Sequence, residues 1–180
     1  MENRIFILEL LENYSSYDEA EELVRKEIIN FVKENRQCFE TDFEPGHITG
    51  GALIVDTDRK HALLTHHAKL HKWIQFGGHS DGHWNPLEVA WREAHEESGL
   101  TTLAYFPGKE GVFDLDIHPI PARGEMPLHK HYDVRILLSA DRNEQFVVTH
   151  ESHDIQWIPL EDVSKYNSEP DFLRMVNKVT

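Results

Sequence analysis

Residues 77–100 read GGHSDGHWNPLEVAWREAHEESGL, and this stretch carries more information about the fold than any other part of the chain. Pro86 suits the first turn of a helix, where its missing N–H group costs no hydrogen bond, and Gly99 suits the residue after the last turn. The segment therefore predicts a glycine-rich loop that leads into a helix, which begins near Pro86 and stops at Gly99.

The expected helix carries three glutamates, Glu93, Glu96 and Glu97, at positions i, i+3 and i+4. With about 100° between successive residues, the three carboxylates share one face and repel one another unless a cation lies between them. Hard divalent cations such as Mg²⁺ and Mn²⁺ prefer oxygen ligands of this kind. Taken alone, the pattern is more typical of a solvated acidic face, so the residues upstream decide between the two interpretations.

The whole string resembles the Nudix box, the signature G-x5-E-x7-R-E-U-x-E-E-x-G-U of the Nudix hydrolase family, in which U is a bulky aliphatic residue. One unbroken register matches six fixed positions, which are Gly78, Arg92, Glu93, Glu96, Glu97 and Gly99. Two positions depart from it: Trp84 replaces the first glutamate, and Ala94 replaces the aliphatic residue after Arg-Glu. A register that starts at Gly82 recovers a glutamate at Glu88 but requires arginine at position 96, so we reject it.

The resemblance implies an α/β fold, the Nudix-type α/β/α sandwich with a mixed β-sheet, here preceded by an N-terminal helical extension. It also implies an enzyme that uses Mg²⁺ or Mn²⁺ to hydrolyse the phosphoanhydride (pyrophosphate) bond of a nucleoside diphosphate linked to another moiety.

By the same resemblance, the loop glycine Gly78 offers its backbone carbonyl to the metal, and Glu93 and Glu97 supply carboxylate oxygens. Glu96 is a ligand either directly or through water. Glu93 also matches the position that accepts a proton from the attacking water in some members, whereas others recruit the base from a later loop. Arg92 is expected to orient the glutamates through charge-assisted hydrogen bonds.

Trp84 cannot replace the salt bridge that the usual glutamate makes with the box arginine. Two substitutes are open: the indole stacks on the guanidinium of Arg92, or Glu88, one turn before Arg92, takes over the ion pair. A cation over an indole contributes about 0.5 to 2 kcal/mol, more than an exposed ion pair, so we favour the stack.

Two groups outside the box complete the expected site. Glu151 lies six residues before Trp157, a spacing at which the family often places a further metal ligand or base. An otherwise acidic chain also gathers cationic and histidine residues after the box, and we interpret them as substrate-binding residues that contact phosphate: Arg123, His129, Lys130, His131 and Arg135. The alternative is that these residues alternate along a strand and face solvent.

Length and composition fit one soluble enzyme domain. With 180 residues and 39% hydrophobic residues, we expect a helical extension at residues 1–40 and a Nudix domain at residues 41–180. The apolar start is too short for a membrane span and lacks a signal cleavage site, and the single Cys38 allows no intrachain disulfide, so we expect a cytoplasmic protein. A net charge of −14 argues against nucleic-acid or membrane partners and leaves a small phosphorylated substrate; a homodimer is compatible with the sequence.

Periodicity predicts helices at residues 4–13 and 18–35, the second capped by Ser16 or Asp18. Strands are predicted at residues 49–55, 62–65, 73–76, 102–106, 112–120, 132–140, 146–148 and 156–158, with helices at both ends of the chain.

Two other functions stay open beside hydrolysis. An isopentenyl-diphosphate isomerase needs a catalytic cysteine, and Cys38 precedes the core strands. A non-catalytic module that binds or senses nucleotides would explain Trp84, but it would have no reason to keep three repelling glutamates. We expect no zinc site, because the adjacent histidine clusters lack the i, i+4 spacing of a zinc protease and no cysteine pair accompanies them. His67 and His71 do stand four apart, but no glutamate lies between them to act as the base. No motif identifies the substrate.

Overall fold

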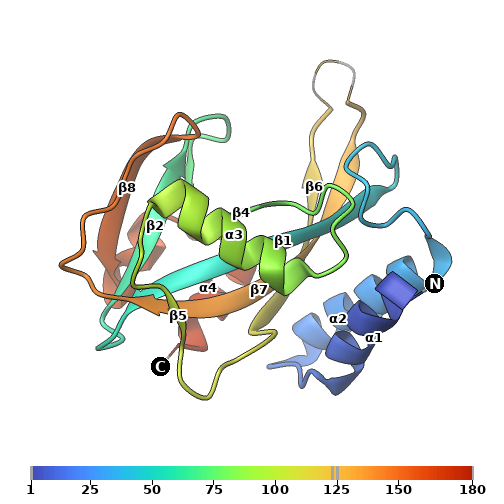
Figure 1. Cartoon of the computed structure of the whole chain (residues 1–180), viewed down its shortest axis with the longest axis horizontal. Coiled ribbons are helices and arrows are strands. Elements are labelled where there is room, and N and C mark those ends of the chain that lie inside the picture. The colour runs from blue at the N-terminus through green and yellow to red at the C-terminus, as the bar shows by residue number, and fades with distance from the viewer. Residues whose placement is uncertain (1, 123, 125, 180) are drawn as a thin grey trace.

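A computed structural model of the chain describes residues 2–122, 124 and 126–179. The helices are α1 (Glu2–Asn13), α2 (Glu19–Glu34), α3 (Pro86–Ser98), the 3₁₀ helix η1 (Leu160–Lys165) and α4 (Pro170–Asn177). The strands are β1 (Gly46–Asp56), β2 (His61–His67), β3 (Lys72–Ile74), β4 (Phe76–His79), β5 (Ala104–Tyr105), β6 (Asp114–Ile120), β7 (His129–Ala140) and β8 (Ser152–Pro159). Together they form the α/β fold that the sequence predicts (Figure 1).

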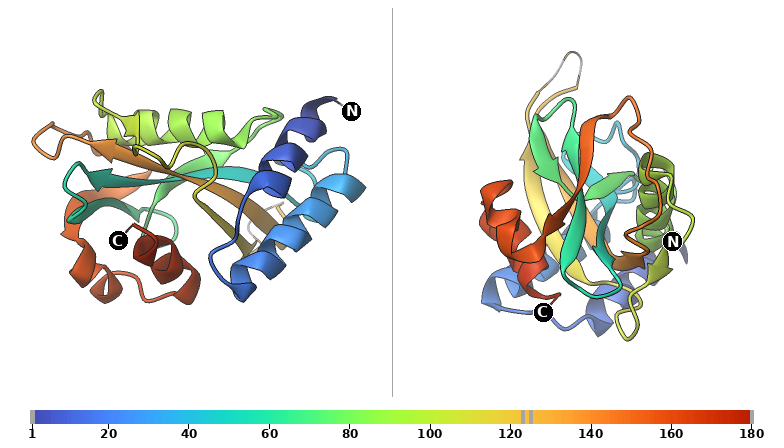
Figure 2. Two further views of the ribbon diagram at one scale, coloured as in Figure 1. Left: turned by 90° about the horizontal axis from the view of Figure 1, so that it is seen from below. Right: turned by 90° about the vertical axis from the view of Figure 1, so that its left-hand side faces the viewer.

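The strands form one mixed, curled sheet of eight strands among the described residues. β1 lies at its centre and pairs in parallel with β7 over its whole length, and it pairs antiparallel with β2 and β4. α3 covers one face of the sheet, and η1 and α4 cover the other (Figure 2). The predicted α/β/α sandwich with a mixed sheet is therefore confirmed.

The core is divided by the central strand. Because successive side chains of a strand point to opposite faces, Ile48 and Ile54 of β1 pack toward α3 and the N-terminal helices. Leu53 and Val55 pack on the opposite face with Met175 of α4. Every residue of β1 is buried, which is expected of a strand that is covered on both faces.

The two N-terminal helices pack together at one end of the sheet, beside β6 (Figure 2). α2 begins after Asp18, whose side chain accepts a hydrogen bond from the N–H group of Glu21, so the cap is Asp18 rather than Ser16. Ile28 and Val32 share the core that contains Ile48, and the division at residue 40 therefore stays a prediction. Within the described part of the chain, no helix is long and apolar enough to cross a membrane.

A buried ionic network ties both ends of the chain to the sheet. Lys178 Nζ lies 2.7 Å from Glu21 Oε1 of α2 and 2.8 Å from Asp114 Oδ1 of β6. It also lies 2.8 Å from the hydroxyl of Tyr14, and burial raises the pKa of that hydroxyl above its usual range. The carboxylates are fully buried, so the lysine charge compensates them where water cannot.

One predicted strand is wrong. Residues 146–148 form no strand; instead the N–H group of Val147 donates to the carbonyl of Ser98 at the end of α3. The Val147 side chain packs against Gly99. This short apolar run therefore covers the end of a helix rather than extending the sheet.

Candidate active site

α3 lies unusually close to the central strand. A Cβ atom at Gly50 of β1 would lie 2.5 Å from the carbonyl oxygen of Pro86 and 2.6 Å from the nitrogen of Ala90, so only glycine fits there. The helix begins after Asn85, whose side chain accepts a hydrogen bond from the N–H group of Leu87, and it ends at Gly99 as predicted. This close packing fixes where the glutamates of α3 stand.

Gly78 of β4 and Glu93 of α3 are in contact. A Cβ atom at Gly78 would lie 2.5 Å from Cδ of Glu93 and within 3 Å of both its carboxylate oxygens. The absence of a side chain at Gly78 therefore lets the Glu93 carboxylate rest against the loop backbone, as close approach of a backbone to another group often requires.

Arg92 holds this glutamate from the helix side. Its Nη2 atom donates to Glu93 Oε1 at 2.6 Å and to the carbonyl of His79 at 3.3 Å. The hydrogen bond to Glu93 is the main reason that the pKa of Arg92 is raised. Arg92 thus joins α3 to β4, consistent with the orienting role expected of it.

Glu151 comes from the segment before β8 and meets Glu97 of α3. The Glu97 side chain is buried and shares a hydrogen bond with Glu151, and the N–H group of Gly77 also donates to Glu97. Burial first, then this hydrogen bond and the charges of Glu151 and Glu93, raise the pKa of Glu97 to about 8. Glu97 therefore keeps its proton at neutral pH when no cation is bound.

These observations fit a hard divalent cation. The negative charges of Glu93, on the same helix, and of Glu151, from a separate segment, both act on Glu97, and Gly78 lies against Glu93. Oxygen donors suit Mg²⁺ or Mn²⁺, and replacing the proton of the Glu97–Glu151 pair by a cation would relieve its repulsion. Glu96 is exposed on the same helix, where water can separate it from the ion.

Neither substitute expected for the missing box glutamate is formed. Within the described residues no cation–π contact joins Trp84 to Arg92. The Trp84 ring instead meets Phe6 of α1 edge to face, with ring centroids 4.9 Å apart. Glu88 pairs with His83 at 2.8 Å rather than with Arg92. Both interpretations of Trp84 were wrong because the sequence did not reveal that α1 packs against this loop.

The five residues expected to contact phosphate have different surroundings in the structure. Arg135 is buried, and its guanidinium donates to three aspartates, which are Asp114, Asp116 and Asp133. This engagement leaves it no role in substrate contact, so that interpretation of Arg135 is corrected to a structural one. Lys130 is exposed and pairs with Glu27 of α2 at 2.8 Å. Arg123 lies outside the described residues.

His129 and His131 belong to a histidine cluster that the sequence did not reveal. The cluster includes His47 of β1 and His79 of β4, which are distant from residues 129–131 in sequence. Only the pairing of β1 with both β4 and β7 brings these rings together, and no sequence spacing could have predicted it.

Comparisons with known proteins identify the family and the fold. A family model described as the NUDIX domain matches residues 46–178. Similar solved structures include an Ap4A hydrolase from C. elegans in a binary complex, at 21% identity and a TM-score of 0.54, with 73% of this chain and 93% of that chain covered. The E. coli dihydroneopterin triphosphate pyrophosphohydrolase has 14% identity and a TM-score of 0.57, with 73% and 92% covered. The MutT protein from Methanosarcina mazei Go1 has 20% identity and a TM-score of 0.56, with 76% and 94% covered.

A search of curated proteins finds no match to the sequence. At the identities of the structural matches, the likeness shows the fold alone, and the family model adds the family.

Proposed function

Because the chain belongs to the Nudix family of hydrolases, we propose that it hydrolyses the phosphoanhydride bond of a nucleoside diphosphate linked to another moiety, with Mg²⁺ or Mn²⁺ as the cofactor. Members of this family generally depend on a divalent metal ion. The observation that carries the proposal is the contact between Glu97 and Glu151, a pair of carboxylates that needs a proton or a cation between them.

Glu93, Glu97 and Glu151 would hold the ion through carboxylate oxygens, with the Gly78 carbonyl as a further ligand and Glu96 acting directly or through water. When bound, the ion would neutralise the charge that develops on the phosphate oxygens. Binding of the ion requires Glu97 to release its proton, so the site exchanges a proton for a metal cation.

Proton transfer from the attacking water is assigned to Glu93, with Glu151 as the alternative. Glu93 is anchored on both sides, by Gly78 and by Arg92 at 2.6 Å, so its carboxylate is held in one orientation. Glu151 is 44% exposed and comes from a segment without regular structure, so it has more freedom to move. A well-positioned base accelerates such a step by roughly a hundredfold or more.

The proposed partner is a small phosphorylated molecule, with no nucleic acid or membrane involved, and the cytoplasm is the proposed location. His129, Lys130 and His131 remain proposed substrate contacts. His131 lies 3.3 Å from His79, whose carbonyl accepts a hydrogen bond from Arg92, although both rings are on the opposite face of the sheet from the carboxylates. A homodimer stays compatible with this proposal.

A panel of phosphoanhydrides tests the proposed function. Purified protein is incubated with Mg²⁺ and, separately, dinucleoside polyphosphates, sugar nucleotides, ADP-ribose or oxidised nucleoside triphosphates, and the products are resolved by chromatography. We expect release of a nucleoside monophosphate or pyrophosphate from at least one compound, and its loss in excess EDTA because the carboxylates cannot accept a polyphosphate without a cation.

The alternative is a nucleotide-sensing module without catalysis, which Trp84 in place of the first box glutamate favours. Binding of a panel compound in calorimetry, with no turnover of any compound in Mg²⁺ or Mn²⁺, would establish that alternative. Full turnover with the metal shown to be absent would instead overturn the proposed role of the carboxylates.

A further inference from the structure

Five histidine rings lie close together where β1, β4, β6 and β7 meet, and they belong to His47, His79, His118, His129 and His131. His47 has no exposed surface, and His129 is buried as well. Neither of its ring nitrogens has a hydrogen-bond partner among the described residues. Burying a polar group without a partner costs free energy, so this ring calls for a ligand.

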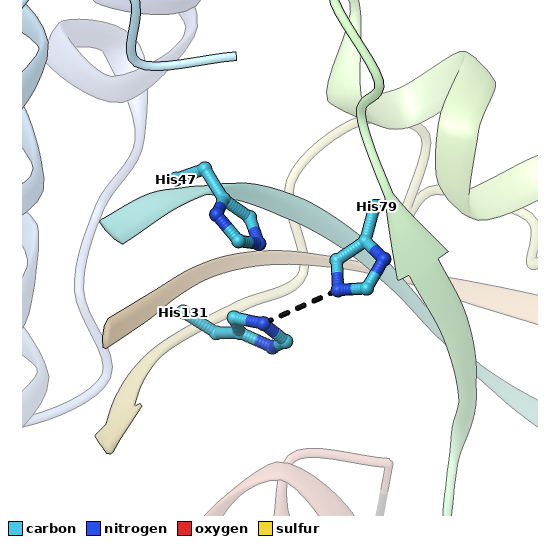
Figure 3. A group of neighbouring side chains, drawn as sticks. All are labelled: His47, His79 and His131. Carbon is cyan, nitrogen blue, oxygen red and sulfur yellow. Dashed lines mark hydrogen bonds between the residues drawn. The ribbon is translucent and has the colours of Figure 1, made fainter. Parts of the chain in front are cut away.

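Three of these rings face a common point. His47 comes from β1, His79 from the end of β4 and His131 from β7, and the rings converge in Figure 3. Each offers one ring nitrogen, and the three nitrogens lie within 4.8 Å of one another. The Nε2 atoms of His79 and His131 are 3.3 Å apart. Two nitrogens bound tetrahedrally to Zn²⁺ at about 2.0–2.1 Å stand about 3.3 Å apart, so this separation fits shared coordination.

The group lies on the opposite face of the sheet from the carboxylates. His47 is the register partner of His131, and His79 is the partner of Thr49, which places all three side chains on one face. Gly50 and Gly78, the neighbouring residues in each strand, contact α3 on the other face. The backbone between them is a single layer, so the two sites are separate but adjacent.

We propose that His47, His79 and His131 bind one borderline divalent metal ion, of which Zn²⁺ is the best example, separately from the ion held by the glutamates. Within the described residues the group comprises these three potential ligands, so the fourth coordination position would be open to water or to a phosphate oxygen. His131 would then meet a phosphate through the ion rather than directly.

The chemistry of the donors selects this class of ion. Imidazole nitrogen suits Zn²⁺ and similar transition metals, whereas Mg²⁺ prefers oxygen. Only neutral imidazole is a ligand, and burial together with the neighbouring histidines lowers the pKa of His47 to about 4 and of His131 to about 2. The two outer histidines pack against the rings of the proposed ligands. They are held in place themselves, because His118 Nδ1 lies 3.3 Å from Asp116 and His129 Nδ1 lies 2.9 Å from the carbonyl of Pro127.

Zinc binding in the presence of excess Mg²⁺ tests the proposal. The metal-free protein is titrated with Zn²⁺ against a chromophoric chelator, and its melting temperature is measured with and without Zn²⁺. We expect one tight site per chain and a higher melting temperature with zinc, because a ligand that binds only the folded state stabilises it. Co²⁺ in the same site should give the visible bands of a tetrahedral nitrogen-coordinated ion.

Four variants localise the ion. His131→Asn and His47→Asn, each checked for native circular dichroism, should weaken zinc binding at least about tenfold to a hundredfold, since even changes outside the ligand shell produce losses of that size. His153→Asn removes a ring from a separate histidine cluster with His66 and His71, and it should keep the site. Glu97→Gln should keep it too.

Each alternative result overturns the proposal. If the wild-type protein binds no zinc, or if His131→Asn binds it as tightly as the wild type, the histidine group is not the site. Loss of zinc in Glu97→Gln alone would assign the ion to the carboxylates, and loss in His153→Asn alone would assign it to the other cluster. These readouts do not depend on hydrolysis, so they stand whether or not the proposed function does.

Discussion

Glu97 and Glu151 show how two neighbouring carboxylates can weaken the fold that contains them. Their carboxylates touch in a site where burial disfavours charge, and the pKa of Glu97 is raised from 4.5 to about 8. The unfolded chain releases its proton near the lower value while the folded chain retains it. Folding is therefore coupled to proton uptake between these two pH values.

We expect the metal-free protein to lose stability as pH rises from about 4.5 to about 8, because the unfolded state then binds fewer protons than the folded state. Glu97→Gln should remove most of this dependence and raise stability at neutral pH. Urea denaturation in EDTA across this pH range measures it.

Glu88→Gln is the matched control, since it removes a carboxylate from the same helix that pairs only with His83 at the surface. It should leave the pH dependence of the wild type intact. A flat profile in the wild type, or an equally steep one in Glu97→Gln, would contradict a shared proton at this pair.

The Trp84 ring contacts Phe6 instead of the guanidinium of Arg92, which it was expected to stack on. We expect Trp84→Ala and Phe6→Ala each to lower the melting temperature and to be non-additive in the double variant. An edge-to-face aromatic pair contributes about 0.5–1.5 kcal/mol beyond the area it buries. Strictly additive losses across this double-mutant cycle would show that the two rings do not interact.

At the scale of elements, the position of the α3 glutamates depends on how closely α3 lies on β1. A methyl group at Gly50 would meet backbone atoms of Pro86 and Ala90, which cannot move without displacing the helix. We expect Gly50→Ala to destabilise the protein by about 1–3 kcal/mol and to lower hydrolysis as well, because Glu93 moves with the helix.

Gly51→Ala is the comparison, since its methyl group would meet the side chains of Asp133 and Arg135 on the other face at 3.1 Å. It should disturb hydrolysis less than Gly50→Ala does. Equal activities in the two variants would argue that the position of α3 does not control the site.

At the scale of the whole molecule, the network around Lys178 joins the N-terminal helices to the sheet and to the C-terminal segment. We expect Lys178→Met to lower the free energy of unfolding by about 3–5 kcal/mol, because it leaves Glu21 buried without its cation, whereas Asp114 keeps its ion pairs with Arg135 and Arg174. Lys165→Met, at an exposed pair with Asp162, should leave the urea midpoint nearly unchanged. Similar midpoints in the two variants would refute the network's role.

The fold was largely predictable because its signals are local. Pro86 at the start of α3 and Gly99 at its end both mark the helix in the sequence. The paired strands β1 and β2, on either side of residues 56–61, show the alternating or continuous apolar pattern of buried strands. The strand expected at residues 146–148 failed because a short apolar run does not say what it packs against. Val147 covers Gly99, a contact that depends on how the loop returns to α3.

The candidate site was predictable only where a spacing within the sequence marks its residues. The glutamates of α3 follow a helical spacing, and Glu151 was found by its distance from Trp157. Arg135 was misread because its three aspartate partners come from two strands, and the histidine group escaped notice because its members come from three. Contacts across strands leave no periodic signal in one sequence.

The central claim is that Glu97 and Glu151, from distant parts of the chain, act on one divalent ion during hydrolysis. The most direct test is the initial rate of the best panel substrate as a function of Mg²⁺ concentration in the wild type, Glu97→Gln, Glu151→Gln and Glu88→Gln. We expect Glu97→Gln and Glu151→Gln to require more Mg²⁺ and to lose on the order of a hundredfold in rate, with Glu88→Gln close to the wild type. Wild-type rates and Mg²⁺ dependence in both Glu97→Gln and Glu151→Gln would contradict the claim.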